Sequence, residues 1–241
     1  IEARYTAMAP EIDGILEEIW ENADSSSHFI QMAPDEGKPA SEKTVVYVLY
    51  DDENLYVAFR CFSGDVTAYV GTWDEGEGDG VGVFLDTFGD KRTGYQFRVN
   101  ARGVQGDAML YNDGRNSDWN WDGVWFAASK IFPWGYSVEI KIPFKSIRYK
   151  KGLTEWGINF SRYINENGEQ DYWAPMKRVE EIRISRFGLL KGINPQSHGR
   201  FLEIYPVLLG RYDKYFNVKE EARPHLGLDL AWSPSPESYL Q

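Results

Sequence analysis

Polar and apolar side chains alternate along one short segment in a way that could build a binding surface. Gln96, Arg98 and Asn100 lie at every second position. The positions beside and between them are apolar, namely Tyr95, Phe97 and Val99. A period of two residues predicts a half-buried β-strand with one face free for polar contacts. A guanidinium fork and two amides suit hydroxyl-rich or anionic ligands, and because no nucleophile accompanies them, the segment favours binding over catalysis.

Four tryptophans lie where they could stack on such a ligand. Aromatic residues make up 15% of the chain and include nine Trp, which is typical both of large β-sandwich cores and of sugar-binding faces. Trp73 lies in a Gly-rich loop, and Trp119 and Trp121 lie in a polar loop over 112–123. Trp173 ends an expected strand. For each ring, the sequence leaves open whether it lines a site or packs in the core.

Four carboxylates gather in the loop 71–80. Asp74, Glu75, Glu77 and Asp79 offer the oxygen ligands that Ca²⁺ prefers. Their spacing does not match an EF-hand loop, and a solvated acidic loop is the alternative interpretation. We expect that no cofactor is required, with a structural calcium ion as the one candidate.

The sequence lacks the common signatures of catalysis. It contains no GxSxG elbow, Walker loop or HExxH motif. The three histidines, His28, His198 and His225, stand outside any catalytic motif. A glycosidase would need two carboxylates facing each other across a cleft, and the many carboxylates here leave that alternative open. We expect a protein that is not an enzyme.

Composition limits the partners. The net charge of −11 and the pI of about 4.8 make nucleic acid and anionic membrane surfaces poor partners. With 42% hydrophobic and 26% charged residues, the 241-residue chain has an ordinary globular composition. Cys61 is the only cysteine and lies in an apolar run, so we expect a buried thiol and no disulfide within the chain. We expect a monomer.

Many short strands must position these residues. Gly- and Asp-rich turns separate them, and only two short helical turns are expected, at 15–21 and 144–147. This pattern predicts an all-β fold, an antiparallel β-sandwich of the immunoglobulin-like or jelly-roll type. The expected strands span 44–50, 55–62, 81–86, 94–100, 107–111, 124–130, 136–142, 155–163 and 171–173.

The composition shifts near 192–199, which divides the chain into a sandwich over 1–195 and a second unit over 196–241. A strand is expected at 201–209. In 226–232, apolar residues alternate with polar or small ones and end on Trp232, a pattern typical of an outer-membrane barrel strand. A C-terminal hairpin packed on the sandwich explains the same pattern equally well.

Ordered motifs across 8–193 resemble family 9 carbohydrate-binding modules. They are PEIDG at 10–14, VVYVLY at 45–50, VFLD at 83–86, GYQFRVN at 94–100, GINF at 157–160 and SRFG at 185–188. The resemblance implies a sugar held between two Trp rings, with Arg and amide groups on its hydroxyls. Arg98 matches the family's arginine, and Trp73 matches the first ring. The second ring is absent, and Glu181 occupies its expected place.

A closer resemblance is to bacterial surface proteins in which such a module precedes a predicted outer-membrane β-barrel. Its motifs are RTGY at 92–95, GVQGD at 103–107, YNDG at 111–114, WDGVW at 121–125 and WAP at 173–175. This resemblance implies that 196–241 is a linker and the truncated start of a barrel, the module's own partner. It also implies export to the periplasm, outer membrane or cell surface of a Gram-negative bacterium, and a start at Ile1 fits a removed leader.

Together these features lead to the hypothesis of non-catalytic saccharide binding at the bacterial cell envelope. Two alternatives remain. A structural or gating domain of the barrel would bury Arg98 in an ion pair and have no open aromatic groove. A glycoside hydrolase, or a module associated with one, would place two carboxylates about 5–10 Å apart across a pocket.

Overall fold

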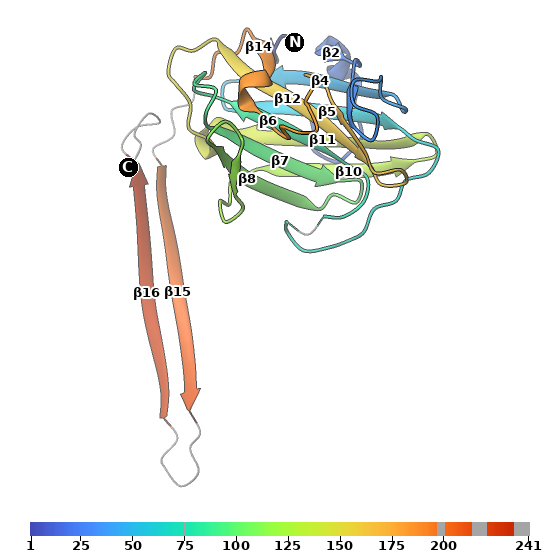
Figure 1. The fold of residues 1–241 in the computed structure, drawn as a ribbon. Helices are drawn as coiled ribbons and strands as arrows, with labels where there is room; N and C mark the ends of the chain where they lie inside the picture. The colour runs from blue at the N-terminus through green and yellow to red at the C-terminus, as the bar shows by residue number, and fades with distance from the viewer. Residues whose placement is uncertain (75, 197–200, 214–220, 234–241) are drawn as a thin grey trace.

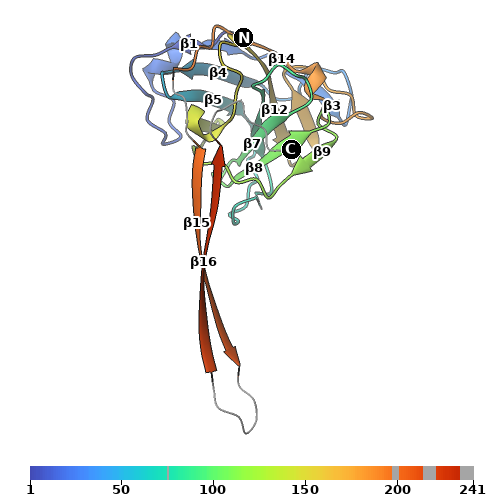
Figure 2. The same ribbon diagram turned by 90° about the vertical axis from the view of Figure 1, so that its left-hand side faces the viewer.

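The structure is a computed structural model that describes residues 1–74, 76–196, 201–213 and 221–233, the last two ranges by their backbone. Two sheets face each other and form a sandwich, and a separate hairpin extends from it (Figures 1 and 2). The prediction of an all-β sandwich with a C-terminal hairpin is confirmed.

The smaller sheet contains six strands. In spatial order, its main path is β1 (Arg4–Tyr5), β4 (Thr44–Tyr50), β5 (Asn54–Phe62), β11 (Gly135–Pro143) and β10 (Phe126–Phe132), while β2 (Asp24–Ser26) also pairs with β4. Its pairings are antiparallel except for the short parallel contact of β1 with β4.

The larger sheet is antiparallel and carries the predicted polar segment near its middle. Its spatial order is β3 (Ile30–Ala33), β13 (Glu169–Tyr172), β12 (Glu155–Ile164), β6 (Gly80–Asp86), β7 (Gly94–Asn100), β8 (Gln105–Tyr111) and β9 (Asn116–Asp118), with β14 (Gly188–Lys191) also on β12. The strands that sequence reasoning missed, β1, β2, β3, β9 and β14, have two to four residues, too few to show a period.

Over the described residues, helix is limited to three short 3₁₀ turns. These are η1 (Glu18–Asn22), η2 (Phe144–Ser146) and η3 (Ile184–Arg186). The turn expected at 144–147 is η2, whereas the one expected at 15–21 begins three residues later. In the described part of the chain, none of the helices has the length and apolar character needed to span a membrane.

The core lies between the sheets and follows the two-residue period of the strands. On β7, Tyr95, Phe97 and Val99 face inward and are at most 3% exposed. Each such side chain stabilises the fold by roughly 1.5–3 kcal/mol through burial. Cys61 lies in the same core as a free thiol, and burial raises its pKa to about 11, as expected for an inert residue.

A second apolar cluster lies on the opposite, outer face of the larger sheet. It contains Phe84 from β6 and Tyr172 from β13, together with Met176 and Ile184 from the segment that follows β13. Because this segment buries its own apolar residues there, it folds over the outer face instead of extending into solvent. This segment thereby forms a wall beside the polar residues of β7.

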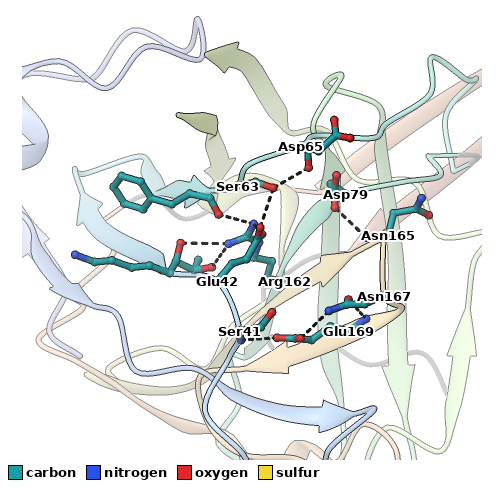
Figure 3. A network of polar contacts seen from close by, with 12 residues as sticks. Ser41, Glu42, Ser63, Asp65, Asp79, Arg162, Asn165, Asn167 and Glu169 are labelled. Carbon is teal, nitrogen blue, oxygen red and sulfur yellow. Dashed lines mark hydrogen bonds and ion pairs between the residues drawn. The ribbon is translucent and has the colours of Figure 1, made fainter. Parts of the chain in front are cut away.

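A network of polar and charged side chains connects β12 to β5 and to the start of β4 (Figure 3). Arg162 on β12 is fully buried and forms an ion pair with Glu42. Its guanidinium also donates to the carbonyl oxygens of Lys43 (3.2 Å) and Phe62 (2.8 Å) and to the Thr44 hydroxyl (3.0 Å). This one side chain therefore ties β12 to β5 and to the start of β4.

Asp171 on β13 is fully buried, and neither of its carboxylate oxygens has a hydrogen-bond donor among the described residues. Burial raises its pKa from 3.8 to about 8, and the neighbouring Glu169 carboxylate adds to the shift. The folded protein therefore favours protonated Asp171. Its contribution to stability is complete below the unfolded pKa of about 3.9 and is lost as the pH rises through about 8.

Asp171→Asn should therefore remove the pH dependence that this carboxyl group gives to the free energy of unfolding. The neutral amide has nearly the same shape, so we expect wild-type-like stability near pH 4 and a gain of about 1–3 kcal/mol at pH 9, where the wild type must bury an unsatisfied charge. Urea unfolding at the two pH values measures the difference. A gain that is equal at both would contradict the assignment.

The C-terminal strands β15 (Phe201–Asp213) and β16 (Glu221–Ser233) pair with each other in antiparallel register. They form a two-stranded sheet separate from the sandwich, and both views show it extending away (Figures 1 and 2). The domain boundary after residue 195 and the membership of this hairpin in a barrel remain predictions.

Candidate functional site

A cleft of about 990 Å³ lies on the outer face of the larger sheet. Its floor comes from β6, β7, β12 and β13, and the loop before β6 and the segment after β13 contribute to its walls. The side chains that line the cleft include those of Gln96, Arg98, Trp119, Tyr172 and Glu181.

Strand register explains why Arg98 is open to the cleft. Its cross-strand partner is Gly82 on β6 and, on the other side, Gly106 on β8. Neither neighbour has a side chain, so the guanidinium is not covered from either strand. A Cβ at either glycine would be crowded, since it would lie 2.6 Å from the Ser161 hydroxyl at Gly82 and 2.9 Å from the Asp74 carboxylate at Gly106.

Arg98 is a free cation in this cleft. Its side chain is exposed, and among the described residues it forms no ion pair and no hydrogen bond. The surrounding protein lowers the pKa of the guanidinium by desolvation, partly offset by Asp74. An arginine remains charged at neutral pH, so its five N–H donors are available to a ligand.

Trp119 supplies the aromatic surface. It follows β9 and remains 41% exposed, and the Arg98 guanidinium carbon lies 4.4 Å from its ring centroid. This is cation–π distance, which orients both groups. A flat ring beside a donor fork suits a sugar, whose C–H face stacks and whose hydroxyls accept hydrogen bonds.

The amide residues of β7 have different roles. Asn100 lines the cleft, but its amide donates to the carbonyl oxygens of Tyr69 (2.8 Å) and Glu77 (3.0 Å) and accepts from the backbone of Arg102 and Val104. It therefore holds the loop wall in place. Gln96 is 3% exposed and lines the floor, and its amide forms no hydrogen bond within the described residues.

The other three candidate tryptophans do not line the cleft. Trp73 packs edge-on against Trp125, with 5.7 Å between ring centroids, though it keeps 42% exposure. Trp121 packs on the inward rings of Tyr95 (5.0 Å) and Phe97 (5.9 Å).

Trp173 contacts Phe160 at 5.6 Å and donates from its ring nitrogen to the Ser26 hydroxyl. Trp121 and Trp173 therefore pack at the margin of the inter-sheet core, whereas Trp73 stays partly exposed against Trp125.

The acidic loop does not converge on a metal site. Asp79 is buried and accepts from the backbone of Thr67 (2.6 Å) and Asn165 (2.9 Å), the latter drawn in Figure 3. Asp74 accepts from the backbone of Asp107. Glu77 lines the cleft, and Glu75 lies outside the described residues. Within the part of the chain described, no three His, Cys, Asp or Glu side chains are placed to hold a metal ion, so calcium remains a prediction.

Sequence reasoning missed Tyr172, which is 7% exposed on the cleft floor. Burial raises its pKa to about 12; the charge of Arg98 acts in the opposite direction, and that of Glu181 acts in the same direction. The predicted strand 171–173 contained Tyr172, but three residues are too few to show which face a side chain lies on.

This arrangement defines a β-sandwich module with a polar, aromatic-edged cleft on one sheet. The chain belongs to the family described as carbohydrate family 9 binding domain-like, whose sequence profile matches residues 12–183.

Solved structures of family 9 carbohydrate-binding modules have a similar fold. A family 9 carbohydrate-binding module from Caldicellulosiruptor kristjanssonii in complex with glucose superposes with a TM-score of 0.60 at 21% identity, over 80% of this chain and 95% of that one. Its complex with cellotriose gives 0.60 at 20% identity, over 82% and 94%.

In sequence, endo-1,4-beta-xylanase A of Thermoanaerobacterium saccharolyticum is 29% identical over 169 residues. The match covers 67% of this chain but only 13% of that enzyme.

Proposed function

We propose that this chain is a non-catalytic module that binds a saccharide in the cleft of the larger sheet. The observation that carries the proposal is the free Arg98 guanidinium stacked on the exposed Trp119 ring. Gln96 adds an uncommitted amide on the floor. The complexes of family 9 modules with glucose and cellotriose support a neutral sugar as the ligand.

The structural alternative is less well supported. A domain without a soluble ligand was expected to bury Arg98 in an ion pair and to lack an aromatic groove. Instead Arg98 is exposed beside an exposed ring, and in the described part of the chain it has no ionic partner. An exposed cation that an aromatic ring holds in place, and that has no ionic partner among the described residues, is a group prepared for a ligand.

The wider setting is part of the proposal. We propose that the module acts at the envelope of a Gram-negative bacterium, as a monomer attached to its own C-terminal barrel, and that it performs no hydrolysis itself. The relative that is a xylanase shares only a small part of its length with this chain, which fits a module that accompanies an enzyme. Calcium, if bound, would have a structural role.

Trp119→Ala tests the stacking surface. We expect saccharide affinity to fall roughly 5- to 100-fold, since stacking on a ring contributes about 1–3 kcal/mol. Isothermal titration of the full chain with glucose, cellotriose and a wider glycan panel measures it.

Trp134→Ala is the matched control, because Trp134 is 36% exposed and stacks on Phe132 in the other sheet. Equal affinities of the two variants, or no binding of any glycan by the folded wild type, would contradict the proposal.

A further inference from the structure

The segment after β13, which contributes to a wall of the cleft, carries an acid. Glu181 lines the cleft and is exposed. Its backbone has a positive φ of 55°, which is uncommon for a residue with a side chain. Its backbone N–H donates to the Lys177 carbonyl oxygen at 2.9 Å, which closes a tight turn. The chain therefore holds this carboxylate at the cleft despite an unfavourable backbone conformation.

The surrounding segment is firmly anchored. Met176 and Ile184, on either side of Glu181, are buried in the outer apolar cluster. Asp113 accepts hydrogen bonds from the backbone N–H (2.8 Å) and hydroxyl (3.1 Å) of Ser185. Glu181 is therefore presented from a rigid wall, which lowers the entropic cost of binding a ligand.

The Glu181 carboxylate has no cation of its own. Its neighbour Glu180 accepts from Arg186 at 2.7 Å, whereas Glu181 forms no ion pair and no side-chain hydrogen bond among the described residues. Glu181 and Arg98 shift the pKa of Tyr172 on the cleft floor in opposite directions, so both charges act within the cleft. The cleft thus holds an unpaired donor group and an unpaired acceptor group.

Resting on the proposed function, we propose that Glu181 is a specificity-determining residue that accepts hydrogen bonds from sugar hydroxyls and disfavours acidic sugars. A carboxylate is an acceptor only, and it can accept from two neighbouring hydroxyls at once. A ligand carboxylate in the same place would meet a like charge with no proton to share. Asp74 and Glu77 line the same cleft and add to this repulsion, while Arg98 and Arg178 supply donors that neutral hydroxyls also satisfy.

Glu181→Gln tests the proposal on the full chain. The probes are cellotriose and the same trisaccharide with one terminal glucose oxidised to glucuronate. We expect the wild type to favour the neutral probe, and the variant to lose about tenfold in affinity for it because a charged acceptor is replaced by a neutral one. In the variant, the ratio of the affinity for cellotriose to the affinity for the glucuronate probe should fall by at least the same factor.

Glu180→Gln is the matched control, since it removes the same charge one residue away from a carboxylate already paired with Arg186. Its affinities and ratio should remain those of the wild type, and unfolding curves of both variants confirm that they fold. If Glu181→Gln leaves affinity and ratio unchanged while the wild type binds cellotriose, the inference is wrong and the proposed function stands. If the wild type binds neither probe nor any other glycan, both are wrong.

Discussion

Arg98→Ala should abolish most of the saccharide affinity and leave the fold intact. Hydrogen bonds from a charged donor contribute about 1.5–3 kcal/mol, so we expect a loss of roughly 10- to 100-fold. The side chain is exposed and has no ionic partner among the described residues, so losing its cation–π contact with Trp119 should lower the free energy of unfolding by no more than about 1 kcal/mol. Titration calorimetry and urea unfolding measure the two quantities.

Arg98→Lys separates charge from geometry. Lysine keeps the charge but replaces the planar fork by a point donor, so we expect an intermediate affinity. Lysine also stacks less well than a planar guanidinium on Trp119. An alanine variant with wild-type affinity would exclude Arg98 from the site, and a strongly destabilised one would show a structural role for it.

Arg162→Leu should have the largest effect on stability. Removing one partner of a fully buried ion pair costs about 3–5 kcal/mol, because the other charge is left uncompensated. The Glu42 side chain keeps 25% exposure, and solvation offsets part of that cost, so we expect a loss toward the lower end of this range. Here Glu42 loses its cation, and the Lys43 and Phe62 carbonyl oxygens lose donors at the same time. The substitution also removes a link between the two sheets, because Arg162 connects β12 of the larger sheet to β5 of the smaller one (Figure 3). Urea unfolding near neutral pH measures it.

Arg186→Met is the control, because it removes an Arg–Glu ion pair that is not buried. Both side chains of this pair are about one-third exposed, and a solvent-exposed pair contributes little to stability, so we expect a much smaller loss than for Arg162→Leu. If the two variants lose similar stability, burial is not what makes Arg162 important.

Sequence and structure agree most closely where the two-residue period is long. On β7, seven residues were enough to assign each side chain to a face, and the predicted core face is buried in the structure. The same period, read from the sequence alone, predicts that Arg98 lies on the face opposite the core. Short strands such as β13 gave no such signal, and Tyr172 was missed for that reason.

The tryptophans show what periodicity cannot decide. Trp119 and Trp121 are two residues apart in one polar loop, and nothing in their local sequence separates them. In the structure, one ring lies against Arg98 in the cleft and the other against Tyr95 in the core. The difference arises because the loop passes the edge of the larger sheet, where one side chain can cover each face.

The sequence by itself determined the sandwich and, where polar and apolar residues alternate strictly as on β7, the core face of the strand, because burial of alternating side chains is a local pattern. It left open whether Arg98 meets a ligand or an ion-pair partner. Only the tertiary structure decided that Arg98 lies against Trp119 and has no ionic partner among the described residues. The wall that carries Glu181 exists because Met176 and Ile184 bury themselves on a distant strand surface. That contact depends on how segments far apart in the chain pack together, and no local period encodes it.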